Sequence, residues 1–190
     1  MRQGIFASLV GVLLLLSGTN GYAANLTLQL GAAFGGDAFI DSGNDQDLAA
    51  GDVIFYGAAV DFDIMDDAFL RLGYSFRDGS SEFDDADEKI SATQLDLLYM
   101  KFINNVVVGG GVTLHQSPEY EINLFGLGTL EQKFDDAMGF AGQLGFMTGH
   151  LELGVRVELI DYDAKGDFIF IDDRSVSANS FGIYLAYQFR

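Results

Sequence analysis

The sequence has no cysteine, no tryptophan and only one proline among its 190 residues. Without cysteine there is no disulfide, no thiol nucleophile and no lipidated anchor, and two histidines alone make a zinc site an unfavourable prediction. Basic residues are scarce too, because 10 lysines and arginines stand against 28 acids. The net charge of −18 leaves no basic patch for nucleic acid, so that class of partner is not expected.

Long apolar runs are missing after the N-terminus, and the first 23 residues have the pattern of a secretory signal peptide. Arg2 supplies the positive start, residues 5–16 form an apolar core, and Gly21 and Ala23 suit the positions before a cleavage site. The apolar core is too short for a membrane-spanning helix. We therefore expect a signal peptide over 1–23 and one β-barrel domain over 24–190.

Apolar residues alternate with small or polar ones along the rest of the chain, which predicts β-strands. Eight strands are predicted, over residues 25–35, 51–63, 68–77, 90–101, 106–116, 135–147, 150–162 and 176–189. Long and short connections alternate strictly between them, as in barrels with short periplasmic turns and long external loops. The predicted fold is all-β, an eight-stranded antiparallel up-and-down transmembrane β-barrel.

Alternation alone does not say which face points outward, because a soluble lipocalin-like barrel buries its apolar face. Here the polar face is made of small residues such as Gly109 and Gly111, which suit a narrow lumen, while the other face is bulky and continuous. Aromatic residues also collect near strand ends, as interfacial girdles do. Ordinary core filling is the alternative for these aromatics: Phe34, Phe62, Phe76, Tyr99, Tyr162, Tyr187 and Phe189.

The last strand has apolar residues at every second position and ends in an aromatic one: Phe181, Ile183, Leu185, Tyr187 and Phe189. Such a closing strand resembles those of bacterial outer-membrane barrels. Together with the leader and the connections, it makes residues 24–190 resemble the small eight-stranded OmpA-like and OmpX-like barrels. The resemblance implies a monomer in the outer membrane, inserted by the outer-membrane assembly machinery and in contact with membrane lipids and lipopolysaccharide. It carries over no catalytic residue.

Seven charged residues have inward parity, which means that they occupy the alternate strand positions expected to face the lumen: Asp61, Arg71, Arg77, Asp96, Glu152, Arg156 and Glu158. An eight-stranded barrel is just wide enough for side chains to fill it, and unpaired charges there are costly. We therefore interpret these residues as a salt-bridge plug in which Arg71, Asp61 and Glu152 lie at similar depth. A gated ion path through the same charges is the alternative.

Most of the acidic residues fall in the long connections, and the default interpretation is that they form a solvated acidic rim. The sharper hypothesis is Ca²⁺ or Mg²⁺ binding, with a bridge to lipopolysaccharide, at Asp41, Asp45, Asp47, Asp84, Asp85, Asp87 and Glu88. The first three alternate as in hard-cation loops, but an EF-hand glycine and bidentate glutamate are missing. The expectation is that no cofactor is required.

The connection over residues 117–134 contains apolar residues and is interpreted as an extension of its hairpin above the membrane. At its start, His115 and Ser117 would share a strand face, which raises the hypothesis of an activated nucleophile. Lipid A deacylases use a similar His-x-Ser strand motif. Here Pro118 replaces the asparagine that follows in that family, and no orienting acid is evident.

The sequence is compatible with three functions. The favoured one is a structural or interaction protein, a plugged barrel that displays acidic loops outside the cell and is not an enzyme. The second is a narrow porin-like channel for small solutes or ions. The third is a lipid A-modifying hydrolase that uses His115 and Ser117.

Overall fold

The structure is a computed structural model that describes residues 24–39, 48–82, 86–124, 128–165 and 175–189. The signal-peptide prediction for residues 1–23 lies outside the described residues. No helix in the described part of the chain has the length and apolar character needed to cross a bilayer.

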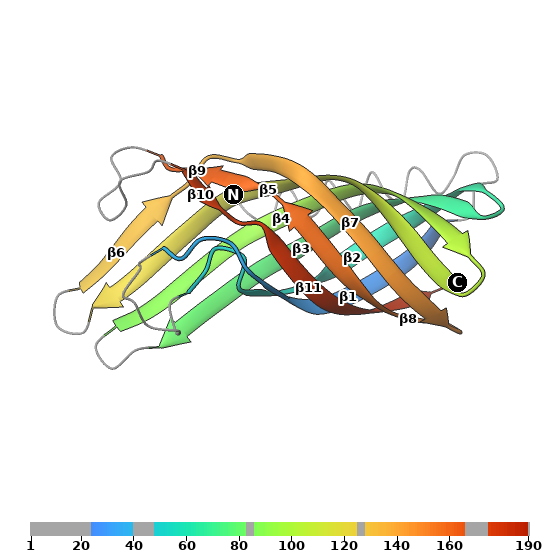
Figure 1. Cartoon of the computed structure of the whole chain (residues 1–190), viewed down its shortest axis with the longest axis horizontal. Coiled ribbons are helices and arrows are strands. Elements are labelled where there is room, and N and C mark those ends of the chain that lie inside the picture. Colours follow the sequence, from blue (N-terminus) through green and yellow to red (C-terminus); the bar gives the residue numbers. More distant parts are fainter. Residues whose placement is uncertain (1–23, 40–47, 83–85, 125–127, 166–174, 190) are drawn as a thin grey trace.

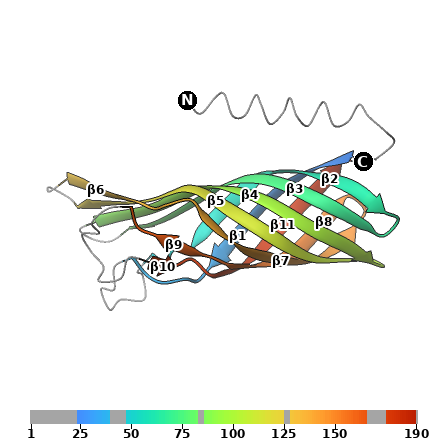
Figure 2. The ribbon, with the colours of Figure 1, turned by 90° about the horizontal axis from the view of Figure 1, so that it is seen from above.

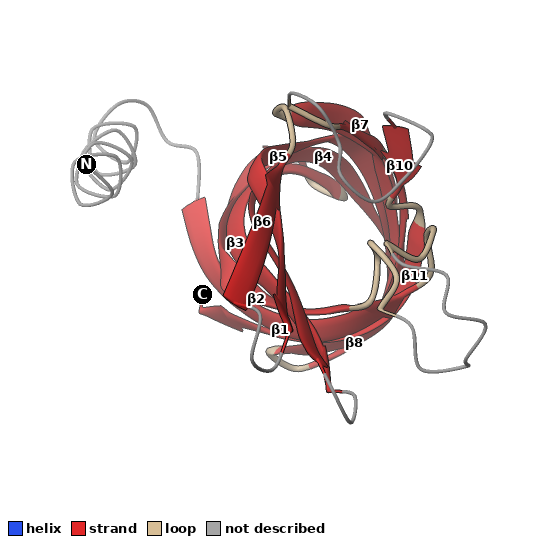
Figure 3. Cartoon of the chain, turned by 90° about the vertical axis from the view of Figure 1, so that its left-hand side faces the viewer, coloured by secondary structure: helices blue, strands red, loops and turns tan. Residues whose placement is uncertain are grey.

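The described chain is built from strands: β1 (Ala24–Phe34), β2 (Val53–Met65), β3 (Ala68–Glu82), β4 (Ala86–Ile103), β5 (Val106–Leu124), β6 (Gly128–Lys133), β7 (Ala137–Thr148), β8 (Leu151–Leu159), β9 (Asp161–Asp163), β10 (Ser175–Ser177) and β11 (Ser180–Phe189). Eight of them close into an antiparallel ring in the order β1, β2, β3, β4, β5, β7, β8 and β11 (Figure 1, Figure 3). The predicted eight-stranded barrel is confirmed.

The ring closes where the last strand pairs with the first. Leu26 of β1 lies opposite Phe189 of β11, and the register continues without a break to Phe34 opposite Phe181. Closure pairs the backbone groups that an open sheet would leave at its edges. The closing strand therefore has the place in the fold that its alternating pattern predicts.

The barrel is apolar outside and polar inside. Along β11 every second residue is buried, from Ser180 to Gln188, while the bulky residues between them are exposed. Leu153 on β8 and Phe140 on β7 are likewise 62% and 67% exposed. A belt of large apolar side chains facing outward would be unfavourable in water and suits the hydrocarbon core of a bilayer.

The aromatic girdle prediction is wrong for one residue. Tyr162 is buried, because it shares the inward face of β8 and β9 with Glu158 and Ile160. By contrast, Tyr187 and Phe189 are exposed near the short-turn end, and Phe34 is exposed at the opposite end. Six of the seven predicted aromatics thus avoid full burial, and Tyr162 instead fills the core.

Three ring strands continue beyond the ring and form, with β6, a protruding sheet that we call the extension (Figure 1, Figure 2). It consists of the far ends of β3, β4 and β5 together with β6, with Glu82 opposite Asp87 and Glu119 opposite Lys133. Much of residues 78–89 and 117–134, which lie outside the predicted strands, is therefore strand. The outward positions of these segments carry polar side chains such as Asp78, Glu119 and Glu121, so apolar alternation does not reveal their strands. The hairpin extension expected for residues 117–134 is present.

A β-bulge in β5 marks the point where the ring ends and the extension begins. The register shifts between the pair Ser91–Glu119 and the pair Thr93–Gln116, and Ser117 has a positive φ of 49°. At this point β5 exchanges its partner β7 for β6. Pro118, expected just beyond the strand, lies inside it at the bulge, where its missing N–H is tolerated.

Candidate functional site

The structure places all seven inward charges inside the barrel, and each of these residues is almost fully buried: Asp61, Arg71, Arg77, Asp96, Glu152, Arg156 and Glu158. They come from β2, β3, β4 and β8, so strands on opposite walls contribute. Three arginines face four carboxylates, which leaves the group close to neutral. The side chains divide into a lower cluster near the short turns and an upper cluster toward the long connections.

The lower cluster is centred on Arg71. Its guanidinium donates hydrogen bonds from Nε to Asp61 Oδ1 over 2.8 Å and from Nη2 to Asp61 Oδ2 over 3.0 Å, which makes a bidentate pair. The same Nη2 reaches across the lumen to Glu152 Oε2 over 3.1 Å. Arg71 thereby joins β2 and β3 to β8, so these three residues do lie at one depth.

Neutral polar residues complete the lower cluster. Thr27 Oγ1 and Gln188 Nε2 each donate to Asp61 Oδ2 over 2.9 Å. Tyr184 donates a hydrogen bond to Glu152, and Arg71 donates Nη1 to Gln143 Oε1 over 3.3 Å. These bonds recruit β1, β7 and β11, and hydrogen bonds to both carboxylates reduce the cost of burying them.

The upper cluster is centred on Glu158. Its carboxylate pairs with Arg77 from the opposite wall and accepts a hydrogen bond from Arg156 Nε over 2.5 Å. Arg156 Nη2 also donates to Asp96 Oδ1 over 2.8 Å. Gln94 joins the cluster, because its Nε2 lies 2.8 Å from Glu158 Oε1 and 2.9 Å from Asp96 Oδ1.

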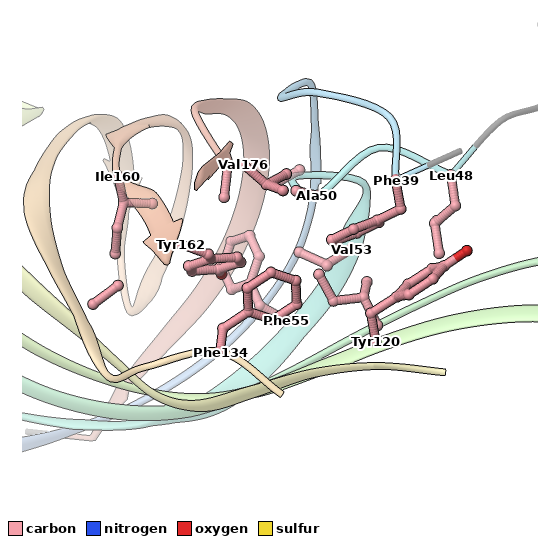
Figure 4. Packing of buried hydrophobic residues seen from close by; sticks show 14 of the residues in the cluster. Phe39, Leu48, Ala50, Val53, Phe55, Tyr120, Phe134, Ile160, Tyr162 and Val176 are labelled. Carbon is pink, nitrogen blue, oxygen red and sulfur yellow. The ribbon is translucent and has the colours of Figure 1, made fainter. Parts of the chain in front are cut away.

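Apolar side chains fill the lumen on both sides of the charges. Toward the short turns, buried residues of β3, β4, β5 and β7 pack together: Phe69, Leu98, Met100, Val107, Ala141 and Met147. At the other end lies a larger group, the mouth cluster, which consists of Phe39, Leu48, Ala50, Val53, Phe55, Ile90, Tyr120, Ile122, Phe134, Ile160, Tyr162 and Val176. Figure 4 shows its labelled members coming together from several strands and connections. Charges in the middle are therefore shielded from water at both ends.

Hydrogen bonds join the described ends of the first and last long connections. Asp37 N donates to Ser177 O over 2.7 Å, and Ser177 N donates to the Asp37 carboxylate over 2.9 Å. Phe39 from the first connection stacks on Tyr120 of β5, with ring centroids 4.2 Å apart. The mouth cluster is thus built from strands and connections that are distant in sequence.

The proposed His–Ser pair does not form. His115 is fully buried and its Nδ1 lies 2.7 Å from the Tyr162 hydroxyl, whereas Ser117 is exposed. Ser117 itself lies in the bulge, where Ser117 and Pro118 stand opposite one residue of β4, and its positive φ breaks the alternation that would place both residues on one face. The prediction of a shared face is wrong for this reason, and the hydrolase hypothesis loses its geometric basis.

Of the predicted cation-loop residues, Asp41, Asp45, Asp47, Asp84 and Asp85 lie outside the described residues. Asp87 lies on the extension, and Glu88 is buried. The Glu88 carboxylate accepts hydrogen bonds from Tyr120 Oη over 2.6 Å and Leu48 N over 3.1 Å. Glu88 therefore anchors the mouth cluster and does not face an external cation, which contradicts its place in the predicted set.

One acidic group on the extension was not singled out from the sequence. Glu119, Glu121 and Glu131 have carboxylate oxygens within 4.8 Å of one another, because β5 and β6 pair these positions. Lys133 Nζ lies 3.3 Å from Glu119 and 3.7 Å from Glu131. The hydrogen bond to Glu119, and then the nearby charges, raise the pKa of the Lys133 ammonium. Lys133 thus neutralises part of the negative charge of the three glutamates, which a bound cation would otherwise neutralise.

Several lumen residues were missed from the sequence because they are uncharged: Thr27, Gln94, Gln143, Tyr184 and Gln188. Their inward parity was readable, but a glutamine or tyrosine at such a position is also common without a charged partner. The signal that identifies them is their pairing with particular carboxylates and arginines, which depends on the register between strands.

Comparisons with known proteins give relatives by structure only. No family model matches the chain, and no curated protein matches it in sequence. The structure is similar to Neisserial surface protein A, with a TM-score of 0.57 and 10% identity over 90% of this chain and 100% of that one. It is also similar to Ail, the attachment invasion locus protein of Yersinia pestis, with a TM-score of 0.53 and 12% identity over 90% and 100%.

A third similar structure is a major outer membrane protein from Thermus thermophilus, with a TM-score of 0.51 and 14% identity over 88% of this chain and 100% of that one. The identities are low, so the likeness concerns the fold. It agrees with the closed ring, the outward apolar belt and the polar interior described above. The chain has the fold of the small eight-stranded β-barrels of bacterial outer membranes.

Proposed function

We propose that this protein is an outer-membrane anchor with a filled lumen, which displays an acidic sheet to the cell's surroundings and conducts no solutes. The observation that carries the proposal is the network of buried ion pairs across the lumen. Arg71 and Glu152 from opposite walls are 3.1 Å apart, and Arg77 pairs with Glu158 in the same way. A solute would have to break these pairs and displace an apolar layer at each end.

The alternative of a narrow channel uses the same charges but needs them to face water. Here Asp61, Arg71 and Glu158 are each at most 1% exposed. Asp61 pairs with Arg71, and Glu158 pairs with Arg77 and Arg156. Eight strands leave an interior that side chains fill. The packing supports the structural and interaction role over the channel. The lost His–Ser geometry supports a role other than lipid hydrolysis.

The chemistry of the extension suggests which partners it would meet. Its outer surface carries Glu119, Glu121 and Glu131 beside a single lysine among these paired positions. Ail of Yersinia pestis has been solved with the heparin analogue sucrose octasulfate. The net charge of −18 would repel such a polyanion, so the partners that we propose are neutral or basic. Lipids, lipopolysaccharide and the outer-membrane assembly machinery remain the proposed partners of the barrel.

Single cysteines test the proposed placement, because the chain contains no cysteine of its own. Thr129→Cys lies at the exposed end of the extension, and Asn105→Cys lies in a short turn at the other end of the barrel. A membrane-impermeant maleimide applied to intact cells is expected to label the Thr129→Cys variant. The Asn105→Cys variant is the matched control and should be labelled only after the outer membrane is permeabilised. Labelling of both variants, or of Asn105→Cys alone, in intact cells would contradict this orientation.

A further inference from the structure

A hollow of about 360 Å³ opens at the rim of the barrel where the apolar belt ends, at the same end as the extension. Its lining comes from the end of β1, the start of β2 and the far part of β3. Its outward side includes Ala32, Phe34, Ile54 and Asp78, and Leu48 and Val53 of the mouth cluster form its inner side. Ala32 has a small side chain on the outward face of β1, while the next outward residues, Leu30 and Phe34, are large and exposed. On its outward side the hollow therefore lies over a small residue within a bulky surface.

The two halves of this hollow differ in chemistry. Phe34 and Ile54 belong to the belt and are 59% and 56% exposed. Asp78 lies directly opposite Ile54 and follows Phe76 in the outward alternation of β3, and Asp52 stands two residues before Ile54. The lining therefore changes from apolar to acidic within one step along each strand. None of the residues that line it is basic.

Both carboxylates are held in place. Gly35 N donates to Asp52 Oδ1 over 2.8 Å, and Tyr56 Oη donates to Asp78 Oδ2 over 3.4 Å. Each carboxylate has a second oxygen that can accept from a ligand. Two carboxylates beside an apolar wall, at the end of the outward apolar belt, are complementary to an amphipathic molecule with a positive head.

We propose that this hollow binds the primary ammonium group of a membrane lipid. The ammonium lies between Asp52 and Asp78, and the acyl chains follow the belt at Phe34 and Ile54. A headgroup that carries only negative charge is disfavoured there, because both carboxylates repel it. The inference rests on the membrane placement proposed above, and it adds a lipid-selective site to that placement.

Native mass spectrometry of the purified full-length barrel tests the site. The barrel is mixed with equal amounts of phosphatidylethanolamine and phosphatidylglycerol that have the same acyl chains. We expect a several-fold excess of phosphatidylethanolamine adducts on the wild type. The double variant Asp52→Asn, Asp78→Asn should lose this preference and bind both lipids alike. Asparagine retains a carbonyl oxygen for the Gly35 N–H, so the loop contact survives.

Two further variants separate charge from shape. Asp161→Asn removes an exposed acid that likewise follows the apolar belt, after Leu159 on β8, and should keep the wild-type preference. Ala32→Leu fills the hollow without changing charge and should reduce the phosphatidylethanolamine excess. Circular dichroism and heat-dependent gel migration confirm that each variant is folded.

Equal binding of the two lipids to the wild type, or an unchanged preference in the folded double variant, would overturn the proposed site. Neither result would bear on the membrane placement or on the filled lumen, because cysteine labelling reports the placement and conductance reports the lumen, both without reference to lipid type.

Discussion

Replacing Arg71 by alanine is expected to lower the free energy of unfolding by about 3–5 kcal/mol. The change leaves Asp61 and Glu152 as buried carboxylates without their common cation, although Thr27, Gln188 and Tyr184 still donate to them. Burying an uncompensated charge costs far more than losing a surface pair. The measurement is reversible urea unfolding in lipid vesicles, followed by circular dichroism.

Lys101→Ala is the control for this prediction. Lys101 pairs with Asp67 over 3.1 Å near a short turn, but about half of each side chain is exposed. Solvent screens such a pair, so its loss should leave stability within error of the wild type. If Arg71→Ala is as stable as Lys101→Ala, the lower cluster does not hold the barrel walls together.

Glu158→Ala is expected to cost a similar amount, about 3–5 kcal/mol, for the opposite reason. It leaves two buried cations without a shared anion, since Arg77 loses its carboxylate and Arg156 keeps only Asp96. Glu158→Gln retains the shape and an acceptor oxygen while removing the charge, so we expect a smaller loss. The difference between the two variants separates charge from packing in the same urea experiment.

A double-mutant cycle of Glu158→Ala with Arg77→Ala tests whether the two residues act as a pair. Removing both partners leaves no unpaired charge on Arg77, so the double variant should be less destabilised than the sum of the single variants by roughly 0.5–3 kcal/mol. Additive losses would show that Arg77 and Glu158 stabilise the barrel independently, against the geometry of the upper cluster.

The ring was predictable because a bilayer imposes a simple rule on sequence. Every second residue of a spanning strand must be apolar, and β11 from Ser180 to Phe189 follows that rule without exception. The rule does not apply to the extension, because its outward positions need not be apolar outside the bilayer. Glu119 and Glu121 therefore occupy outward positions there. The strand ends at Glu82 and Leu124 were therefore placed too early.

Parity also predicted which charges enter the lumen. It placed Arg71 and Glu152 inside, and their similar distance from the short turns indicated that they lie near one another. It did not predict that Asp61 would bind Arg71 in bidentate fashion, because that depends on the register of β2 against β3.

Parity failed where the chain departs from regular alternation. The bulge at Ser117 turns His115 and Ser117 to different faces and brings Tyr120 inward. Glu88 appeared to be one acid among many in a loop, yet it accepts a hydrogen bond from Tyr120 inside the mouth cluster. Both outcomes depend on contacts between strands, which a single sequence does not contain.

The most direct test of the filled lumen is conductance across a planar lipid bilayer that contains the purified barrel. The account predicts no reproducible current steps for the wild type at any applied voltage, because the paired charges and the two apolar layers leave no continuous path for ions. Reproducible steps in the wild type, whose size changes in a folded Arg156→Ala variant, would show that ions pass through the upper cluster and would contradict the central claim.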